Sequence, residues 1–262
     1  MNRATSQFPV WVALVGSGLA GVLVALQSRV NGGLSQELGN GYVTAATSFG
    51  SGLIIMCIMV MLSPRARVGL GRVSGEITAR KLPVWTLLGG SAGSMFVLAQ
   101  GLVAPLTGLA LFTVGIVAGQ VLGGLILDRV GLGPGGRMDP TPLRVVGTVL
   151  AVVAVVVAVG SNLGTLHHVW LVVFPFVIGA LVAGQSMVNG IVRAAARSAI
   201  ASTFINFVVG TAILLVTAAI SVIVSGWPTN WPSSPWYYIG ESLAPSLLPS
   251  QRCSCAPPEC CC

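Results

Sequence analysis

Two pairs of side-chain amides stand in otherwise apolar stretches of this sequence, Gln27 with Asn31 and Gln185 with Asn189. The members of each pair are four residues apart, so that in a helix they lie one above the other on one face. Amides donate and accept hydrogen bonds, but they are neither nucleophiles nor general bases. This spacing therefore predicts binding of a polar group, or bonding between helices, rather than catalysis.

The two pairs belong to an internal repeat. Residues 21–32 and 179–190 are identical at nine of twelve positions, at a constant offset of 158 residues. The register continues without a gap, so that Ser48 corresponds to Asn206. Because Gln, Ser, Asn and Gly match at fixed spacing, a chance match between apolar segments is a poor explanation.

Composition predicts the elements that carry these residues. Hydrophobic residues make up 54% of the 262 residues and charged residues 7%, too few charges to cover a soluble protein. A hydrocarbon core of about 30 Å needs about 20 apolar residues per helix. We predict an all-α integral membrane bundle of about seven spans, at 9–30, 41–62, 83–104, 105–127, 145–160, 169–190 and 201–225.

The net charge of +7 comes from cations in short loops between apolar spans, which is the positive-inside pattern and not a nucleic-acid surface. The loops 63–82, 128–144 and 191–198 carry Arg or Lys. The loops near 105, at 161–168 and at 226–235 carry neither. We therefore expect a multi-pass protein of the plasma (inner) membrane with a cytoplasmic N-terminus.

Five spans separate the two copies, so the copies should cross the membrane in opposite directions. We interpret residues 1–160 as a first five-span repeat and 161–240 as a partial second one, with two spans and the start of a third. Residues 241–262 form a Pro/Ser/Cys tail. An inverted repeat places a binding site at the repeat interface, which opens to each side in turn as one repeat rocks against the other.

In this topology the polar residues form two groups, which we interpret as gates of a substrate pathway. Those expected near the external side are Gln27, Asn31 and Ser48, and those expected near the cytoplasmic side are Gln185, Asn189 and Asn206. Gln120 is a further candidate to line the cavity. The alternative is that intramembrane amides only hold neighbouring helices together.

Arg29 is the intramembrane cation of the first copy, and Met187 replaces it in the second. Near a helix end its side chain can extend to the interface and anchor the helix, which is the role we favour. Contact with an anionic group of the substrate is the alternative. Asp128, beside Arg129 at a membrane edge, is expected to be a solvated charge.

Small residues recur at helical spacing in the third and fourth spans. Residues with this spacing let helix backbones approach closely. The helix-packing candidates are Gly89, Gly93, Gly115, Gly119 and Gly123.

The sequence lacks the residues that proton relay, catalysis, metal binding or phosphate binding would need. No carboxylate lies deep in a span, so that a carboxylate proton relay has no obvious carrier. We find no metal-ligand spacing, no nucleophile paired with a base and no phosphate loop, and we expect neither an enzyme nor a cofactor. Five cysteines crowd residues 253–262, but without histidine or a zinc-site framework they do not predict a metal site.

These residues resemble the YdcZ-type branch of the drug/metabolite transporter superfamily. The likeness covers residues 9–160 as one full repeat and 170–240 as part of a second. It implies five-span units, single or fused in tandem, that act as inner-membrane transporters without an assigned substrate. The residues that carry it are Gln27 to Gly32, Ser48, Phe49, Gly52, Gly89, Gly90, Gly93, Pro105, Gly108, Gly119, Gln120, Asp128 and Gly131.

The sequence departs from this pattern near its end. Residues 234–240 match 83–89, the start of the third span, but a polar stretch with four prolines follows. We expect a shifted reading frame or a misplaced end, with a genuine disordered tail as the alternative; translation of the other two frames of the coding DNA would decide.

We predict a secondary transporter that moves a small molecule by alternating access. The competing prediction is a transport-incompetent fragment or assembly subunit, which pairs through its glycine ridges with a second copy or another repeat unit. The partners expected are the bilayer and a small molecule, and uptake by liposomes would separate the two readings.

Overall fold

The computed structural model describes residues 10–133, 136–160 and 170–238. The N-terminal segment with Arg3, the loop with His167 and His168, and the tail 241–262 lie outside the described residues. The described chain is helical and contains no strand, which confirms the all-α prediction. Its elements are α1 (Val10–Leu38), α2 (Gly41–Leu62), α3 (Pro64–Thr78), η1 (Val84–Leu88), α4 (Gly89–Leu102), α5 (Ala104–Thr107), α6 (Leu109–Val130), α7 (Pro142–Gly160), α8 (Trp170–Ala196), α9 (Ala199–Ser225) and η2 (Pro235–Tyr238).

Four helices in the described part of the chain are long and apolar enough to cross a membrane, namely α2, α6, α8 from Val173 onward, and α9. Helix α7 has a shorter apolar stretch, Pro142–Val157. These helices make the protein a membrane-embedded helical bundle. The count of seven spans and the inverted repeat stay predictions.

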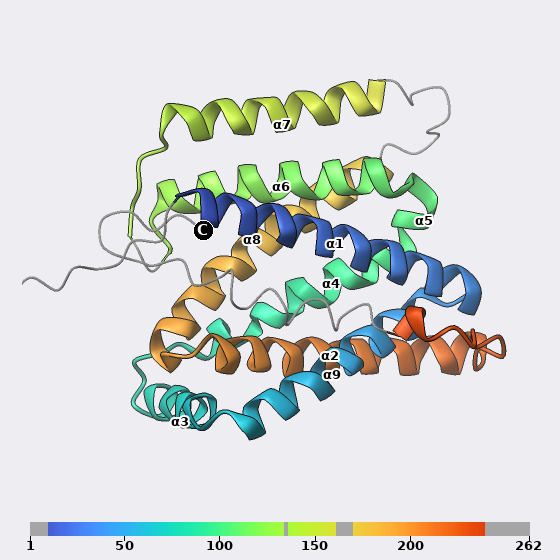
Figure 1. The fold of residues 1–262 in the computed structure, drawn as a ribbon, viewed down its shortest axis with the longest axis horizontal. Coiled ribbons are helices and arrows are strands. Elements are labelled where there is room, and N and C mark those ends of the chain that lie inside the picture. Colours follow the sequence, from blue (N-terminus) through green and yellow to red (C-terminus); the bar gives the residue numbers. More distant parts are fainter. Residues whose placement is uncertain (1–9, 134–135, 161–169, 239–262) are drawn as a thin grey trace, which may run out of the picture.

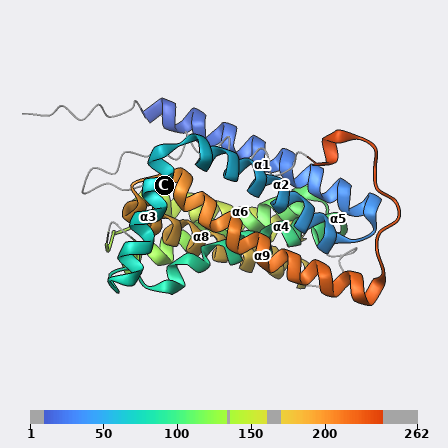
Figure 2. The same cartoon turned by 90° about the horizontal axis from the view of Figure 1, so that it is seen from below.

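The long helices run side by side along the length of the bundle (Figures 1 and 2). Helix α3, the segment before α7 and the α8–α9 turn lie at one end, and the α1–α2 turn, α5 and the end of α9 lie at the other (Figure 1). The segments that carry most of the cations are therefore gathered at one end. Three arginines come from α3 alone, Arg65, Arg67 and Arg72.

Helix α1 is longer than the predicted first span. It has 29 residues and ends at Leu38 rather than near Val30. Arg29 is consequently nine residues, or about 14 Å, from the end of the helix. The expectation that Arg29 lies near a helix end was wrong, because the polar residues after Asn31 continue the helix instead of ending it.

The predicted basic loop 63–82 contains a helix. Ser63 caps α3, since its Oγ accepts from the backbone N–H of Ala66 at 3.3 Å, and Pro64 occupies the first helical turn. The side of α3 with small residues faces the end of α8 and the α8–α9 turn, and a Cβ at Gly69 would lie 2.9 Å from the carbonyl oxygen of Ala196. The sequence predicts a loop here because the arginines of α3 leave only a narrow buried face, formed by Ala66, Gly69 and Val73.

Helix α4 lies at the centre of the bundle and contacts α1, α2, α8 and α9. It has only 14 residues, and the short 3-10 helix η1 precedes it. The predicted third span, 83–104, is therefore a 3-10 turn followed by a helix. Most of its small residues are buried, including Gly89, Gly90 and Gly93.

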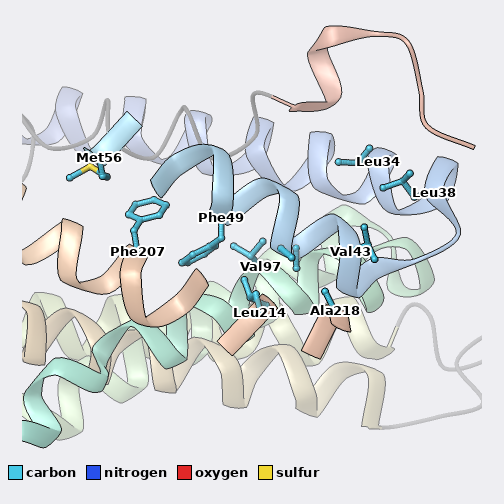
Figure 3. Close-up of a cluster of buried hydrophobic side chains, with 11 residues drawn as sticks. Leu34, Leu38, Val43, Phe49, Met56, Val97, Phe207, Leu214 and Ala218 are labelled. Carbon is cyan, nitrogen blue, oxygen red and sulfur yellow. The ribbon is translucent and has the colours of Figure 1, made fainter. Parts of the chain in front are cut away.

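The largest apolar cluster joins α2 to α9 (Figure 3). Phe49 and Phe207, which correspond to one another in the repeat, have ring centroids 5.0 Å apart with the planes tilted by 40°. This geometry is favourable for an aromatic pair. Met56 and Leu214 are fully buried in the same cluster.

Helices α6 and α8 meet backbone to backbone. A Cβ added at Gly119 would overlap the carbonyl oxygen of Phe176, and a Cβ at Gly179 would overlap that of Ile116. At Gly123 the nearest atom would be the Cα of Ala180, at 2.9 Å. Only glycine fits these positions, and we call this contact the α6–α8 seam.

Candidate functional site

The first amide cluster consists of Asn31, Ser48, Ser28 and Gln100, joined by a chain of hydrogen bonds. Ser48 Oγ donates to Asn31 Oδ1 at 2.9 Å, and Asn31 Nδ2 donates to Gln100 Oε1 at 2.7 Å. Gln100 Nε2 then donates to Ser28 Oγ at 2.7 Å. The chain ties α1 to α2 and α4.

This first amide cluster is closed to solvent. Asn31 and Gln100 have no exposed surface, and Ser28 and Ser48 are 3% and 2% exposed. Among the described residues no buried side-chain nitrogen or oxygen lacks a partner. A fully satisfied buried network of this kind rigidifies its surroundings.

Gln100 and Ser28 were missed in the sequence. Gln100 is an intramembrane amide, which is the signal that singled out Gln27, but it lies outside the matching segments 21–32 and 179–190. Ser28 lies within the match and is paired with Ser186. Neither residue could be placed in the cluster without knowing how α4 packs on α1.

The second amide cluster consists of Gln185, Asn189 and Asn206, and it faces the glycine side of α4. A Cβ at Gly89 would lie 3.0 Å from Oδ1 of both Asn189 and Asn206. A Cβ at Gly93 would lie 2.8 Å from Gln185 Nε2.

The glycines of the third span thus give the amides of α8 and α9 access to the backbone of α4. At Gly90 the fit is closer still, because a Cβ there would overlap the carbonyl oxygen of Asn206. Sequence reasoning singled out Gly89 and Gly93 for packing, but it could not say which helices they meet.

The two clusters differ in their hydrogen bonding. Within the described residues, the side chains of Gln185, Asn189 and Asn206 make no hydrogen bond to another protein group. Gln185 and Asn189 are half-buried, and Asn206 is 9% exposed. Polar side chains that are partly accessible and not bonded within the protein can bind a polar ligand.

The remaining candidates lie apart from these contacts. Gln27 is buried on the same side of α1 as Asn31, whereas Arg29 is exposed. Gln120 is half-buried on α6, and its backbone nitrogen would lie 3.0 Å from a Cβ at Gly179. No hydrogen bond joins Gln120 to either cluster in the described part of the chain.

Asp128 differs from expectation. Arg144 Nη2 donates to Asp128 Oδ2 at 2.5 Å, with the two side chains 30% and 31% exposed. The carboxylate is therefore paired with the first turn of α7 and is not a free solvated charge. Arg129, its neighbour in sequence, is exposed.

Two hollows in the described structure lie away from the candidates. One is an apolar cavity of about 340 Å³ between α4, α5 and α8, lined by Met95, Leu98, Ala99, Leu102, Val103, Leu106 and Phe174. The other, of about 170 Å³, lies between the α1–α2 turn and the end of α9. The amides of the second cluster lie at the surface where α8 and α9 face α4.

Comparison with known families decides the identity. Residues 12–157 and 170–243 match the family described as "Putative inner membrane exporter, YdcZ". The chain belongs to the YdcZ family. The match covers both copies of the repeat, and it confirms the resemblance that the glycine and amide motifs indicate.

Searches of curated proteins and of solved structures found no match to this YdcZ-family protein. Family membership and the apolar helices make it an inner-membrane transport protein.

Proposed function

We propose that this protein exports an uncharged or zwitterionic polar molecule by alternating access, with the two amide clusters as the gates of the pathway. One observation carries the proposal: the first cluster is a closed hydrogen-bonded network, whereas the amides of the second make no hydrogen bond within the described protein. A pathway closed at one end and accessible at the other fits one state of an alternating-access cycle.

The packing of the short 3-10 helices supports the repeat on which this mechanism depends. Helices η1 and η2 lie in the matching segments 83–89 and 234–240. Helix η1 packs on α8 and α9 of the second copy, and η2 packs on α1 and α2 of the first. In each copy the segment predicted to begin the third span thus packs on the first two helices of the other copy. A two-fold axis between the copies would produce this reciprocal packing.

Transport by the purified protein is the direct test. Liposomes that contain it should concentrate at least one compound from a ¹³C-labelled extract of cell metabolites, relative to empty liposomes, as measured by mass spectrometry. Gln185→Ala and Asn189→Ala should each lower that uptake about threefold to tenfold, the loss expected for one hydrogen bond of about 1 kcal/mol to the cargo.

Ser186→Ala is the matched control for these variants. Ser186 is exposed on the same helix, next to Gln185, and its Oγ donates to the carbonyl oxygen of Val182 at 3.0 Å. Its uptake should equal that of the unmodified protein. If all three variants transport equally well and melt at the same temperature, the second cluster is not a gate.

Orientation is a separate prediction. Because α3 and the other basic segments share one end, we expect that end to face the cytoplasm. In a protein freed of its own cysteines, Ser74→Cys should be protected from an impermeant maleimide in intact cells, and Thr229→Cys should be labelled. Both positions are exposed in the described structure. The opposite labelling pattern would reverse the proposed direction of the gates.

The competing function is a subunit that pairs with another chain through its glycine ridges. Helix α6 gives this function little support. Its ridge at Gly119 and Gly123 is occupied by α8 of the same chain.

A further inference from the structure

We propose that the exposed face of α1 is a docking surface for the fourth span of another YdcZ-type repeat unit, a membrane helix with a Gly-x-x-x-Gly ridge and an Asp at its end. The face is formed by Gly18, Gly21, Val22, Leu26 and Arg29. It does not depend on transport, and it concerns assembly rather than cargo.

The repeat supplies the first argument. Gly21 corresponds to Gly179, and Val22 corresponds to Ala180. Gly179 is buried, and a Cβ there would overlap the carbonyl oxygen of Ile116 in α6. Gly21 is exposed, and a Cβ there would meet nothing within 4 Å.

The same contrast holds along the helix. Val22 is 57% exposed, whereas Ala180 is half-buried, with its backbone nitrogen 3.0 Å from a Cβ at Gly119. A Cβ at Gly18 would meet nothing within 4 Å, whereas the carbonyl oxygen of its counterpart Phe176 lies against Gly119 of α6. Positions that α6 covers on α8 are therefore uncovered on α1, within the part of the chain that the structure describes.

Arg29 is the second, independent argument. It is exposed, it lies about 14 Å from the end of α1, and it shares a helix face with Val22 and Leu26. A cation on a surface turned towards lipid is costly, and intramembrane cations generally have a counter-charge. The face of α1 is thus a poor lipid-facing surface.

The repeat also indicates where that counter-charge comes from. Met187, which corresponds to Arg29, lies beside the end of α6, with its Cγ 3.9 Å from a Cβ at Gly133. Asp128 is in the last turn of α6. A fourth span seated on α1 in the same way would bring its terminal Asp towards Arg29. This ion pair would select the partner helix.

A second copy of this chain is a weaker candidate for the occupant. Its own α6 ridge already packs on its own α8, and its Asp128 pairs with Arg144. The occupant must present an unoccupied ridge, which a repeat unit with a free fourth span would do.

The test uses the full chain and a synthetic peptide of residues 109–131, in detergent micelles. The peptide has the ridge and Asp128 but lacks Arg144, so both features are free. It contains no Trp, whereas α1 carries Trp11, which is 66% exposed. Energy transfer from tryptophan to a dansyl group at the peptide N-terminus should rise to saturation as the peptide-to-detergent ratio increases.

Gly21→Leu should weaken binding of the peptide by about tenfold or more, since it fills the space the ridge would enter. Arg29→Gln in the chain and Asp128→Asn in the peptide should each weaken it, and the two together should cost little more than either alone. Gly147→Leu is the matched control, because Gly147 is exposed on α7 with nothing near its Cβ position.

Two outcomes would overturn the proposal. The first is absence of saturable transfer to the unmodified chain. The second is equal binding by the Gly21→Leu and Gly147→Leu chains, which would place the peptide elsewhere. If the chain instead forms dimers that crosslink through Gly18→Cys and exclude the peptide, the occupant is a second copy and the assignment to another repeat unit is wrong.

Discussion

Replacing Gly119 by alanine should destabilise the protein by about 3 kcal/mol, the upper part of the range for overpacking a close-fitting site. The added methyl group would overlap the carbonyl oxygen of Phe176 and lie 3.0 Å from the backbone nitrogen of Ala180. Backbone atoms of a neighbouring helix cannot rotate away as a side chain can. The two helices must separate, and the whole α6–α8 seam loosens with them.

The matched control is Gly124→Ala on the same helix, where a Cβ would meet nothing within 4 Å. Alanine has the higher helix propensity, so this variant should be neutral or gain about 0.5–1 kcal/mol. Unfolding of the purified protein in rising mole fractions of dodecyl sulfate, followed by circular dichroism, measures both. Equal stability of the two variants would show that the backbones of α6 and α8 do not approach closely at Gly119.

Replacing Gln100 by methionine should cost about 2 kcal/mol of stability. The change keeps the side-chain length but removes the acceptor for Asn31 Nδ2 and the donor to Ser28 Oγ. A buried donor left without a partner costs about 1–3 kcal/mol, and hydrogen bonds between membrane helices average about 0.6 kcal/mol with a maximum of about 1.7.

Gln120→Met is the control for this change, because Gln120 is half-buried without a hydrogen bond in the described part of the chain. It should alter stability by less than about 0.5 kcal/mol, as other substitutions away from specific contacts do. The double variant Asn31→Leu with Gln100→Met should cost less than the sum of the single ones, since both break one network. Strict additivity would show that the two amides act independently.

Much of the architecture could be predicted from the sequence because a membrane helix is recognised by the apolar composition of one continuous segment. The helical class, the second and seventh spans and the family follow from apolar length and from the repeated motif. Asn31 and Ser48 were grouped by helix spacing and adjacency in the chain, and they are hydrogen-bonded.

The parts that were missed depend on contacts between distant segments. Gln100 lies 69 residues after Asn31 in the chain. It joins the first cluster only because α4 packs against α1 beside Asn31. The arginine-rich segment of α3 has the composition of a loop because its buried face consists only of Ala66, Gly69 and Val73. Arg29 was misplaced because polar residues after Asn31 can continue a helix as well as end one.

The glycine contacts also decide which helices move together. Gly119 and Gly179 fasten α6 to α8, and Gly90 fastens α4 to α9, in each case backbone against backbone. The surface between α8 and α4 is different, since there the side chains of Gln185 and Asn189 face Gly93 and Gly89.

Closely packed backbones resist sliding, whereas side chains can change rotamer and allow small shear displacements. Among these four helices, we therefore expect a shear of the α6–α8 pair past the α4–α9 pair to meet less resistance than separation of either pair. Each of these pairs combines one helix from the first copy with one from the second. The surface between the two pairs does not coincide with the boundary between the two repeats. It contains the second amide cluster, so that Gln185 and Asn189 lie where α8 would slide past α4.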